Sequence, residues 1–306
     1  MFKQFNYNTN VYGGTEYMGK EFYINIFYRL PKLNNYLCLI MPGMTPNLPQ
    51  IISDKREIIA WVHNTPKQFT DGAFQILSHK LFINKVKYII VPSLAAKHMF
   101  LRELPDYPED KIYPIYNAIY PLWYNKEKFN NPKQIKIIHT SSADRGMGIM
   151  MDALKFVDED FRLEVYNNFD PDLYPEYPID ERVRFYGKTP KATVKEAFES
   201  AHIFAYSADY EETFCLSMVE AMSAGCLPVY PNVGALAEVS NEFGILYKYP
   251  KENYDEHVEL FAKNLTTAIK EIKSNNWNPD FQVDYINSKY SWQRCEEHWL
   301  ELHDKL

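Results

Sequence analysis

Residues 206–238 read YSADYEETFCLSMVEAMSAGCLPVYPNVGALAE, and this stretch decides the fold class. An apolar run at 202–206 leads into a polar loop that contains Glu211 and Glu212, and a helical pattern then continues to about Ala224. Gly225 follows, at the position where a left-handed residue commonly ends a helix. A second apolar run covers 226–230. This order of strand, helix and strand predicts a parallel βαβ unit.

The same alternation extends in both directions along the chain. The expected strands are 36–41, 57–62, 87–92, 112–116, 135–139, 162–166, 183–187, 202–206, 226–230 and 243–247. The expected helices are 15–30, 73–85, 94–104, 146–157, 191–200, 214–224, 255–274 and 290–306. Most of these strands are continuous apolar runs, which is typical of parallel sheets covered by helices on both faces.

A polar stretch at 123–134 divides the strands into two sets. We therefore predict an α/β protein with two Rossmann-like, doubly wound lobes, at 1–128 and 129–287, followed by a terminal helix at 288–306. Ligands of such sheets bind at the carboxyl ends of the strands, so a cleft between the lobes is the expected site.

The composition indicates an ordinary globular protein and argues against a nucleic-acid binder. The 306 residues are 46% hydrophobic and 24% charged, as in an ordinary globular protein, and the net charge of −7 argues against nucleic acid as a partner. Four scattered cysteines predict free thiols in a reducing compartment. Without an apolar span or a leader pattern, we expect a cytoplasmic protein. Residues 1–128 contain 15 basic and 10 acidic side chains, which could draw this lobe to an anionic membrane surface.

We expect a ligand-binding site at the start of the helix after Glu212. We place this start near Thr213, so the backbone amides of Phe214, Cys215 and Leu216 would lack helical partners and could hold an anion such as a phosphate. Glu212 and Glu220 would flank that anion, and carboxylates accept hydrogen bonds from sugar hydroxyls. The alternative is that acidic residues there only stabilise the helix dipole, which accounts for Glu212 but not for Glu220.

The motif Glu212-x7-Glu220, followed by Ala221-Met222 and by Gly225-x-x-Pro228-Val229, resembles the signature of family-4 retaining glycosyltransferases. The resemblance covers nearly the whole chain and is strongest over 135–240. It implies the GT-B architecture: two Rossmann-like lobes facing a central cleft, and a C-terminal helix that crosses back to the first lobe.

Two segments of the first lobe fit the same resemblance. Gly13 and Gly14 resemble the glycine loop that approaches the donor, and His63 stands where a histidine of the family faces the donor sugar. Only the sequence MFKQFNYNTN precedes the glycine loop, so the first strand is either minimal or lost, and the acceptor side of the lobe would be truncated.

Two segments of the second lobe also fit. Arg145-Gly146 resembles the phosphate clamp after the first strand of this lobe, where a guanidinium can grip a phosphate with two hydrogen bonds. Gly187 and Lys188 stand where the loop of the family contacts the nucleotide base.

The resemblance implies a retaining glycosyltransferase that moves a hexose or pentose from a UDP- or GDP-linked sugar to a glycan, lipid-linked or other hydroxyl acceptor. No metal or other cofactor is expected, because Asp170-Pro171-Asp172 reads as a turn. We expect Glu212 and His63 to act at the reaction centre and Glu220 to accept from the ribose. Three alternatives remain open: a nucleotide-sugar 2-epimerase, a non-catalytic sugar-nucleotide binder, and a nucleic-acid glucosyltransferase.

Overall fold

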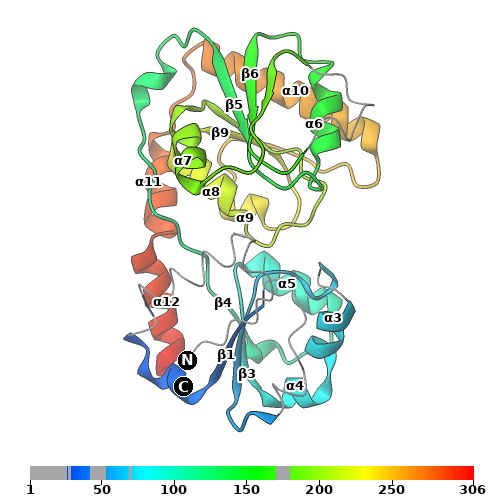
Figure 1. The fold of residues 1–306 in the computed structure, drawn as a ribbon, viewed down its shortest axis with the longest axis vertical. Helices are drawn as coiled ribbons and strands as arrows, with labels where there is room; N and C mark the ends of the chain where they lie inside the picture. Colours follow the sequence, from blue (N-terminus) through cyan, green and yellow to red (C-terminus); the bar gives the residue numbers. More distant parts are fainter. Residues whose placement is uncertain (1–25, 27–28, 42–52, 69–70, 170–179) are drawn as a thin grey trace. The chain divides into compact units, whose positions relative to one another are not determined.

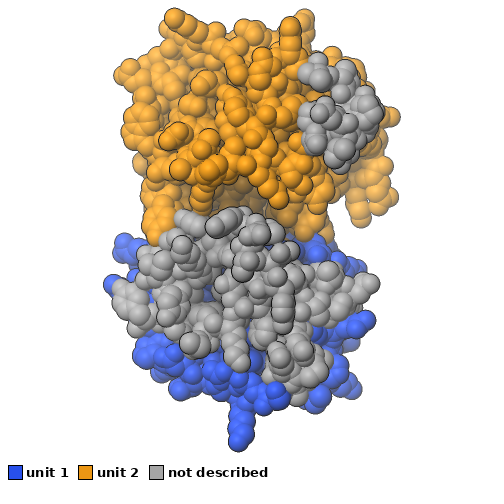
Figure 2. Space-filling model, viewed as in Figure 1, with its two compact units in different colours: residues 1–118, 290–306 blue, residues 119–289 orange. Residues whose placement is uncertain are grey.

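The computed structural model describes residue 26 and residues 29–41, 53–68, 71–169 and 180–306. Its chain forms two packing units, coloured separately in Figure 2. Unit 1 comprises Met1–Ala118 and Tyr290–Leu306, and unit 2 comprises Ile119–Lys289. The chain therefore returns to unit 1 for its last segment.

Unit 1 contains a parallel four-stranded sheet in the order β1-β2-β3-β4 (Figure 1). The strands are β1 (Leu37–Met41), β2 (Ile58–Val62), β3 (Val86–Val91) and β4 (Ile112–Pro114). The helices are α3 (Asp71–Ser78), α4 (Lys80–Lys85), α5 (Leu94–Glu103) and α12 (Trp292–Asp304), with short 3-10 turns at Pro31–Asn35, Pro66–Gln68 and Glu109–Lys111. All five residues of β2 are buried, as expected for an interior strand covered on both faces.

Unit 2 contains a parallel six-stranded sheet in the order β10-β9-β8-β5-β6-β7. The strands are β5 (Ile135–His139), β6 (Phe161–Val165), β7 (Val183–Phe185), β8 (Ile203–Ala205), β9 (Leu227–Pro231) and β10 (Ile245–Tyr247). The helices are α6 (Met147–Leu154), α7 (Lys191–Ser200), α8 (Leu216–Ser223), α9 (Leu236–Ser240), α10 (Tyr254–Lys273) and α11 (Asp280–Lys289). The chain builds the sheet outward from β5 to β7 and then returns to place β8 on the other side of β5.

Apolar side chains from both faces of the second sheet form its core. On one face, Met150 of α6 and Phe261 of α10 join a buried cluster with Ile137 and Leu163 of the strands. On the other face, Phe198 of α7 lies 6.3 Å from Phe204 of β8, ring centre to ring centre. The inner strands β8 and β9 are thus buried along their whole length, which is why their sequences are continuous apolar runs.

The segment that we expected to link the lobes packs along unit 2, so the two units divide at Ala118/Ile119 and not at residue 128. The Leu122 amide donates to Ser223 Oγ at 3.0 Å, and the Tyr124 hydroxyl donates to Asp280 at 2.8 Å. Lys128 donates from its amine to the Ala224 carbonyl at 2.7 Å. These polar contacts, together with buried Phe129, fix residues 119–129 to the second sheet and its helices.

Several helix boundaries differ from the expected ones. The expected helix 73–85 is two helices, because His79 is extended (ψ 127°) and its ring caps α4 by accepting from the Leu81 amide. The expected terminal helix begins at Trp292, because Ser291 is extended and caps it by accepting from the Arg294 amide. Helix α11 was not predicted from the sequence, because its apolar residues form no regular stripe. The glycine loop and most of the expected helix 15–30 lie outside the described residues, which include only residues 26, 29 and 30 of that range.

Candidate functional site

The second sheet reverses its strand order between β5 and β8, and the candidate site lies at the carboxyl ends of these two strands. In parallel sheets the loops that leave such a pair diverge to opposite faces, which opens a space for a ligand. The loop after β5 contains Arg145, and the loop after β8 contains Glu212. The ring of His139, the last residue of β5, contacts the Ala205 carbonyl of β8 through Nδ1 at 3.0 Å and ties the two strands together there.

Arg145 and Glu212 meet in an ion pair. Arg145 Nη1 lies 2.7 Å from Glu212 Oε1, with 6% of the Glu212 side chain and 32% of the Arg145 side chain exposed. The Arg145 guanidinium also lies over the ring of Tyr210, 4.5 Å from its centre. Burial alone would lower the pKa of Arg145, but the negative charge of Glu212 raises it overall, so this side chain stays cationic.

A third side chain joins this pair. The hydroxyl of Tyr206 donates to the same Oε1 atom of Glu212, and Tyr206 is fully buried. Burial and, next, the charge of Glu212 raise the pKa of Tyr206 well above its usual value. Tyr206 was not predicted from the sequence, because it reads as the last apolar residue of a strand. The available signal was its position directly before the acidic loop.

Two glycines hold the loops in place. Gly146, next to Arg145, has a φ of 89°, and a Cβ atom there would lie 2.0 Å from the Ser207 carbonyl oxygen. Gly234 has a φ of 58°, and a Cβ atom there would lie 2.5 Å from both the backbone nitrogen and the backbone oxygen of Glu212. The Glu212 carbonyl also accepts from the Ala235 amide at 2.7 Å. The backbone on both sides of the ion pair is therefore closely packed.

The helix after Glu212 begins at Leu216, so its expected start near Thr213 is wrong. Cys215 adopts a left-handed conformation (φ 66°), which a helical residue cannot have, and no side chain caps the helix. Thr213, Phe214 and Cys215 form a buried approach to α8. Of the amides predicted to bind an anion, only that of Leu216 belongs to the first turn of the helix.

Glu220 lies on α8 and forms a different ion pair. Its Oε1 lies 3.0 Å from Lys191 Nζ, at the start of α7, with 17% of the Glu220 side chain exposed. Lys191 follows the loop that contains Gly187 and Lys188, so this contact joins that loop to α8. A Cβ atom on Gly187 would meet nothing within 4 Å, although its φ is 68°. The backbone at Gly187 is therefore open to close approach, and Lys188 is exposed.

His63 belongs to unit 1, directly after β2. It is 7% exposed, and its ring centre lies 4.8 Å from that of Trp61. Burial lowers the pKa of His63 to about 3, so the imidazole is neutral at physiological pH and can form hydrogen bonds but does not act as a cation. Gly13 and Gly14 lie outside the described residues.

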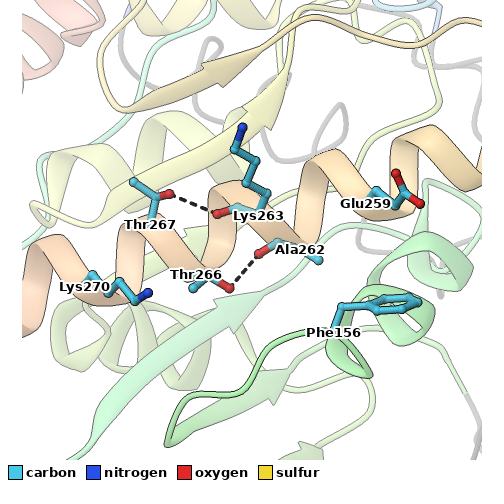
Figure 3. Close-up of a pocket in the computed structure, with 7 residues that line it drawn as sticks. All are labelled: Phe156, Glu259, Ala262, Lys263, Thr266, Thr267 and Lys270. Atoms are coloured by element: carbon cyan, nitrogen blue, oxygen red, sulfur yellow. Dashed lines mark hydrogen bonds between the residues drawn. The ribbon is translucent and has the colours of Figure 1, made fainter.

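A groove of about 400 Å³ elsewhere on unit 2 is a poor alternative site. It lies against the outer side of α10, next to Phe156 (Figure 3). The hydroxyls of Thr266 and Thr267 donate to carbonyls of their own helix, at 2.9 and 3.0 Å. The groove also contains charged Glu259, Lys263 and Lys270, but it lies away from the carboxyl ends of β5 and β8 and contains none of the predicted site residues.

The described part of the chain contains neither a metal-binding cluster nor a membrane-spanning helix. Within it, no group of three or more His, Cys, Asp or Glu side chains could hold a metal ion. Asp170 and Asp172 lie outside it. Among the same described residues, no helix has the length and apolar character needed to cross a membrane.

Comparison with known proteins gives a consistent result. Residues 172–278 match the model of the family described as glycosyl transferases group 1. One subunit of human phosphatidylinositol N-acetylglucosaminyltransferase is 28% identical over 131 residues, which are 42% of this chain and 26% of that protein. An uncharacterized glycosyltransferase of Methanocaldococcus jannaschii is 26% identical over 219 residues, 64% of this chain and 54% of that protein. This chain thus spans from about a quarter to about half of these relatives.

Solved structures extend the likeness to nearly the whole chain. Anabaena HepE in complex with UDP-glucose superposes with a TM-score of 0.71 at 14% identity, covering 92% of this chain and 82% of that one. A variant of S. aureus TarM in complex with UDP, alpha-GlcNAc-glycerol and fondaparinux gives a TM-score of 0.65 at 18% identity, covering 90% and 57%. With two parallel-sheet α/β units, the chain has the GT-B fold, as the sequence predicted.

Proposed function

We propose that this protein is a glycosyltransferase that takes its sugar from a nucleotide diphosphate sugar bound to unit 2. The observation that carries the proposal is the Arg145–Glu212 pair at the strand-order reversal of a Rossmann-type sheet. It sets a permanent cation beside a carboxylate, and these are the groups that a diphosphate and a sugar hydroxyl require. The match of residues 172–278 to group 1 glycosyl transferases includes Glu212 and helix α8 but not Arg145.

Most of the predicted residues have a role in this proposal. Arg145 and the amides at the start of α8 bind the diphosphate and stabilise its charge as it leaves. Glu212 accepts from donor-sugar hydroxyls, and Glu220 accepts from the ribose. The open backbone at Gly187 contacts the base, with Lys188 beside it. For neutral His63 and for Gly13 and Gly14, the proposed role is contact with the donor.

The proposed reaction keeps the anomeric configuration and needs no metal. The acceptor hydroxyl oxygen bonds to the anomeric carbon on the face from which the phosphate leaves, while the bond from that carbon to the phosphate oxygen breaks. The hydroxyl proton passes to the departing phosphate oxygen. No side chain of unit 2 needs to form a covalent bond with the sugar.

The donor proposed first is a UDP-sugar, because HepE and TarM structures contain UDP or UDP-glucose, and a GDP-sugar is the next choice. A hexose such as glucose or N-acetylglucosamine is proposed as the transferred group, in line with the name of the human relative. The acceptor is proposed to be a glycan or lipid-linked hydroxyl, and basic residues of the first 128 positions would favour peripheral contact with an anionic membrane.

A ligand screen followed by a transfer assay tests the proposal. The thermal midpoint of the full chain should rise with one nucleotide and rise further with one of its sugars, because a ligand of the folded state stabilises it. Glu212→Ala should then reduce transfer by at least ~100-fold, the scale of losing a polar group that acts on the developing charge. The variant should remain folded at the assay temperature, although its unfolding midpoint falls because Arg145 and Tyr206 lose their partner. Well-folded protein that responds to no nucleotide or sugar nucleotide would refute the proposal.

A further inference from the structure

Tyr206 is outside the predicted site residues, yet it makes the most buried contact in the site. Its amide donates to the Val229 carbonyl at 2.9 Å, which continues the β8–β9 ladder and fixes the backbone. Its ring lies 6.0 Å from that of Phe204 and 6.1 Å from that of His139, centre to centre. The hydroxyl therefore points at Glu212 from a rigid strand end and not from a mobile loop.

Both contacts to the Glu212 carboxylate use the same oxygen. Tyr206 and Arg145 each donate to Oε1, and Oε2 has no hydrogen-bond partner among the residues that the structure describes. A carboxylate has two oxygens and about four acceptor positions, so fixing one oxygen leaves the other in a defined direction. This arrangement orients Glu212 before any ligand arrives.

The two donors differ in how strongly they are committed to Glu212. About a third of the Arg145 side chain is exposed, whereas Tyr206 is fully buried and has a raised pKa that keeps its hydroxyl protonated. Arg145 also has five N–H donors, so it can turn part of its guanidinium to another anion. Tyr206 has a single O–H donor, and that donor is already given to Glu212.

We propose that Tyr206 is a positioning residue that holds Glu212 Oε1 in place, so that Oε2 accepts from a hydroxyl of the donor sugar while Arg145 turns to the diphosphate. This inference rests on the proposed function, because it assigns a sugar nucleotide to the site. It predicts that Tyr206 contributes to binding of the donor sugar and not to binding of the nucleotide. A role only in folding would affect both ligands alike.

The test compares Tyr206→Phe with Tyr230→Phe in the full chain. Tyr230 is an equally buried tyrosine of the same sheet, and its hydroxyl is bonded to Ser240 and to the Phe243 carbonyl, so its variant controls for losing a buried hydroxyl. Calorimetric titration measures binding of UDP against UDP-glucose and UDP-N-acetylglucosamine, and of GDP against GDP-mannose. Tyr206→Phe should weaken the sugar nucleotide about 10-fold, the scale of one hydrogen bond to a charged group, while the matching nucleotide changes less than about 2-fold.

A double variant links the effect to Glu212. Glu212→Gln should remove the preference for the sugar nucleotide, and adding Tyr206→Phe to it should cause no further loss, because both act on one contact. Tyr230→Phe should bind every probe as the wild type does. Equal weakening of nucleotide and sugar nucleotide by Tyr206→Phe, or no weakening of either, would overturn the inference and leave the proposed function standing. If the wild type binds none of the five probes, the proposed function fails and the inference fails with it.

Discussion

Replacing Gly146 by alanine tests whether the loop that carries Arg145 is packed as tightly as the structure indicates. Three costs add at this position. The left-handed φ of 89° costs a non-glycine residue about 1–2 kcal/mol. A Cβ atom 2.0 Å from the Ser207 carbonyl oxygen must push the backbone after β8 away, and such overpacking costs ~1–3 kcal/mol.

The third cost is a hydrogen bond. Ser207 Oγ donates to the Gly146 carbonyl at 2.7 Å, and a shift large enough to relieve the clash breaks it, at ~1 kcal/mol. We therefore expect Gly146→Ala to lower the free energy of unfolding by about 4 kcal/mol. For a unit of about 150–250 residues this corresponds to a midpoint roughly 8–16 °C lower.

Gly187→Ala is the matched control. Its φ of 68° is also left-handed, but an added Cβ atom would meet nothing within 4 Å. Only the conformational cost remains, about 1–2 kcal/mol, which lowers the midpoint by roughly 2–8 °C. Differential scanning calorimetry of the full chain measures both variants. Equal midpoints for Gly146→Ala and Gly187→Ala would refute the close approach of the β5 and β8 loops.

Two further predictions concern stability. Lys128→Met should lower the thermal unfolding midpoint by roughly 4–8 °C. The part-buried amine of Lys128 donates to the carbonyls of Glu199 and Ala224 at the ends of two helices, and these hydrogen bonds contribute ~2 kcal/mol to stability. Lys128→Arg should recover part of the loss, and an unchanged midpoint for the methionine variant would contradict the capping role. Burial lowers the pKa of His139 to about 4 from 6.5, so the folded protein binds fewer protons than the unfolded chain between these values, and stability falls as the pH is lowered through this window. This contribution to the free energy of unfolding is roughly 3 kcal/mol. In calorimetry from pH 7 to pH 4, the unfolding midpoint of His139→Phe should therefore decline less steeply than that of the wild type. Identical slopes of midpoint against pH would contradict a buried neutral imidazole.

Most strands of both sheets were predictable from the sequence, because they are largely apolar runs of the kind that parallel strands covered on both faces tolerate. The outer strands β6 and β7 include charged residues and are only partly buried. Helix boundaries were not predictable where a single residue stops a helix. His79 and Cys215 carry no breaker signature, and their extended and left-handed backbones follow from tertiary packing. Helix α11 was also missed, because its apolar residues form no regular stripe and Phe281 among them is exposed.

The site was predictable in part. Glu212 and Arg145 were identified from their motifs, and the structure brings them together. Tyr206 was not, because a tyrosine at the end of an apolar run usually serves packing, and only the fold shows that its hydroxyl reaches the carboxylate. The assignment of Glu220 to a ribose and of His63 to a sugar stays a prediction.

The energetic cost of the contacts around Arg145 and Glu212 favours a functional interpretation of them. Moving a carboxylate and a guanidinium out of water is costly, and apolar residues of similar volume are often as stable as a buried ion pair. Cys215 is also held at a φ of 66°, a conformation that costs a non-glycine residue about 1–3 kcal/mol. Glu212 and Cys215 lie within the short segment from β8 to α8, and Arg145 reaches Glu212 from the loop after β5, next to two glycines that have no room for a side chain. Folding alone gives no reason to gather so many unfavourable features at one strand end, whereas the proposed anion and sugar site would account for the buried charges among them.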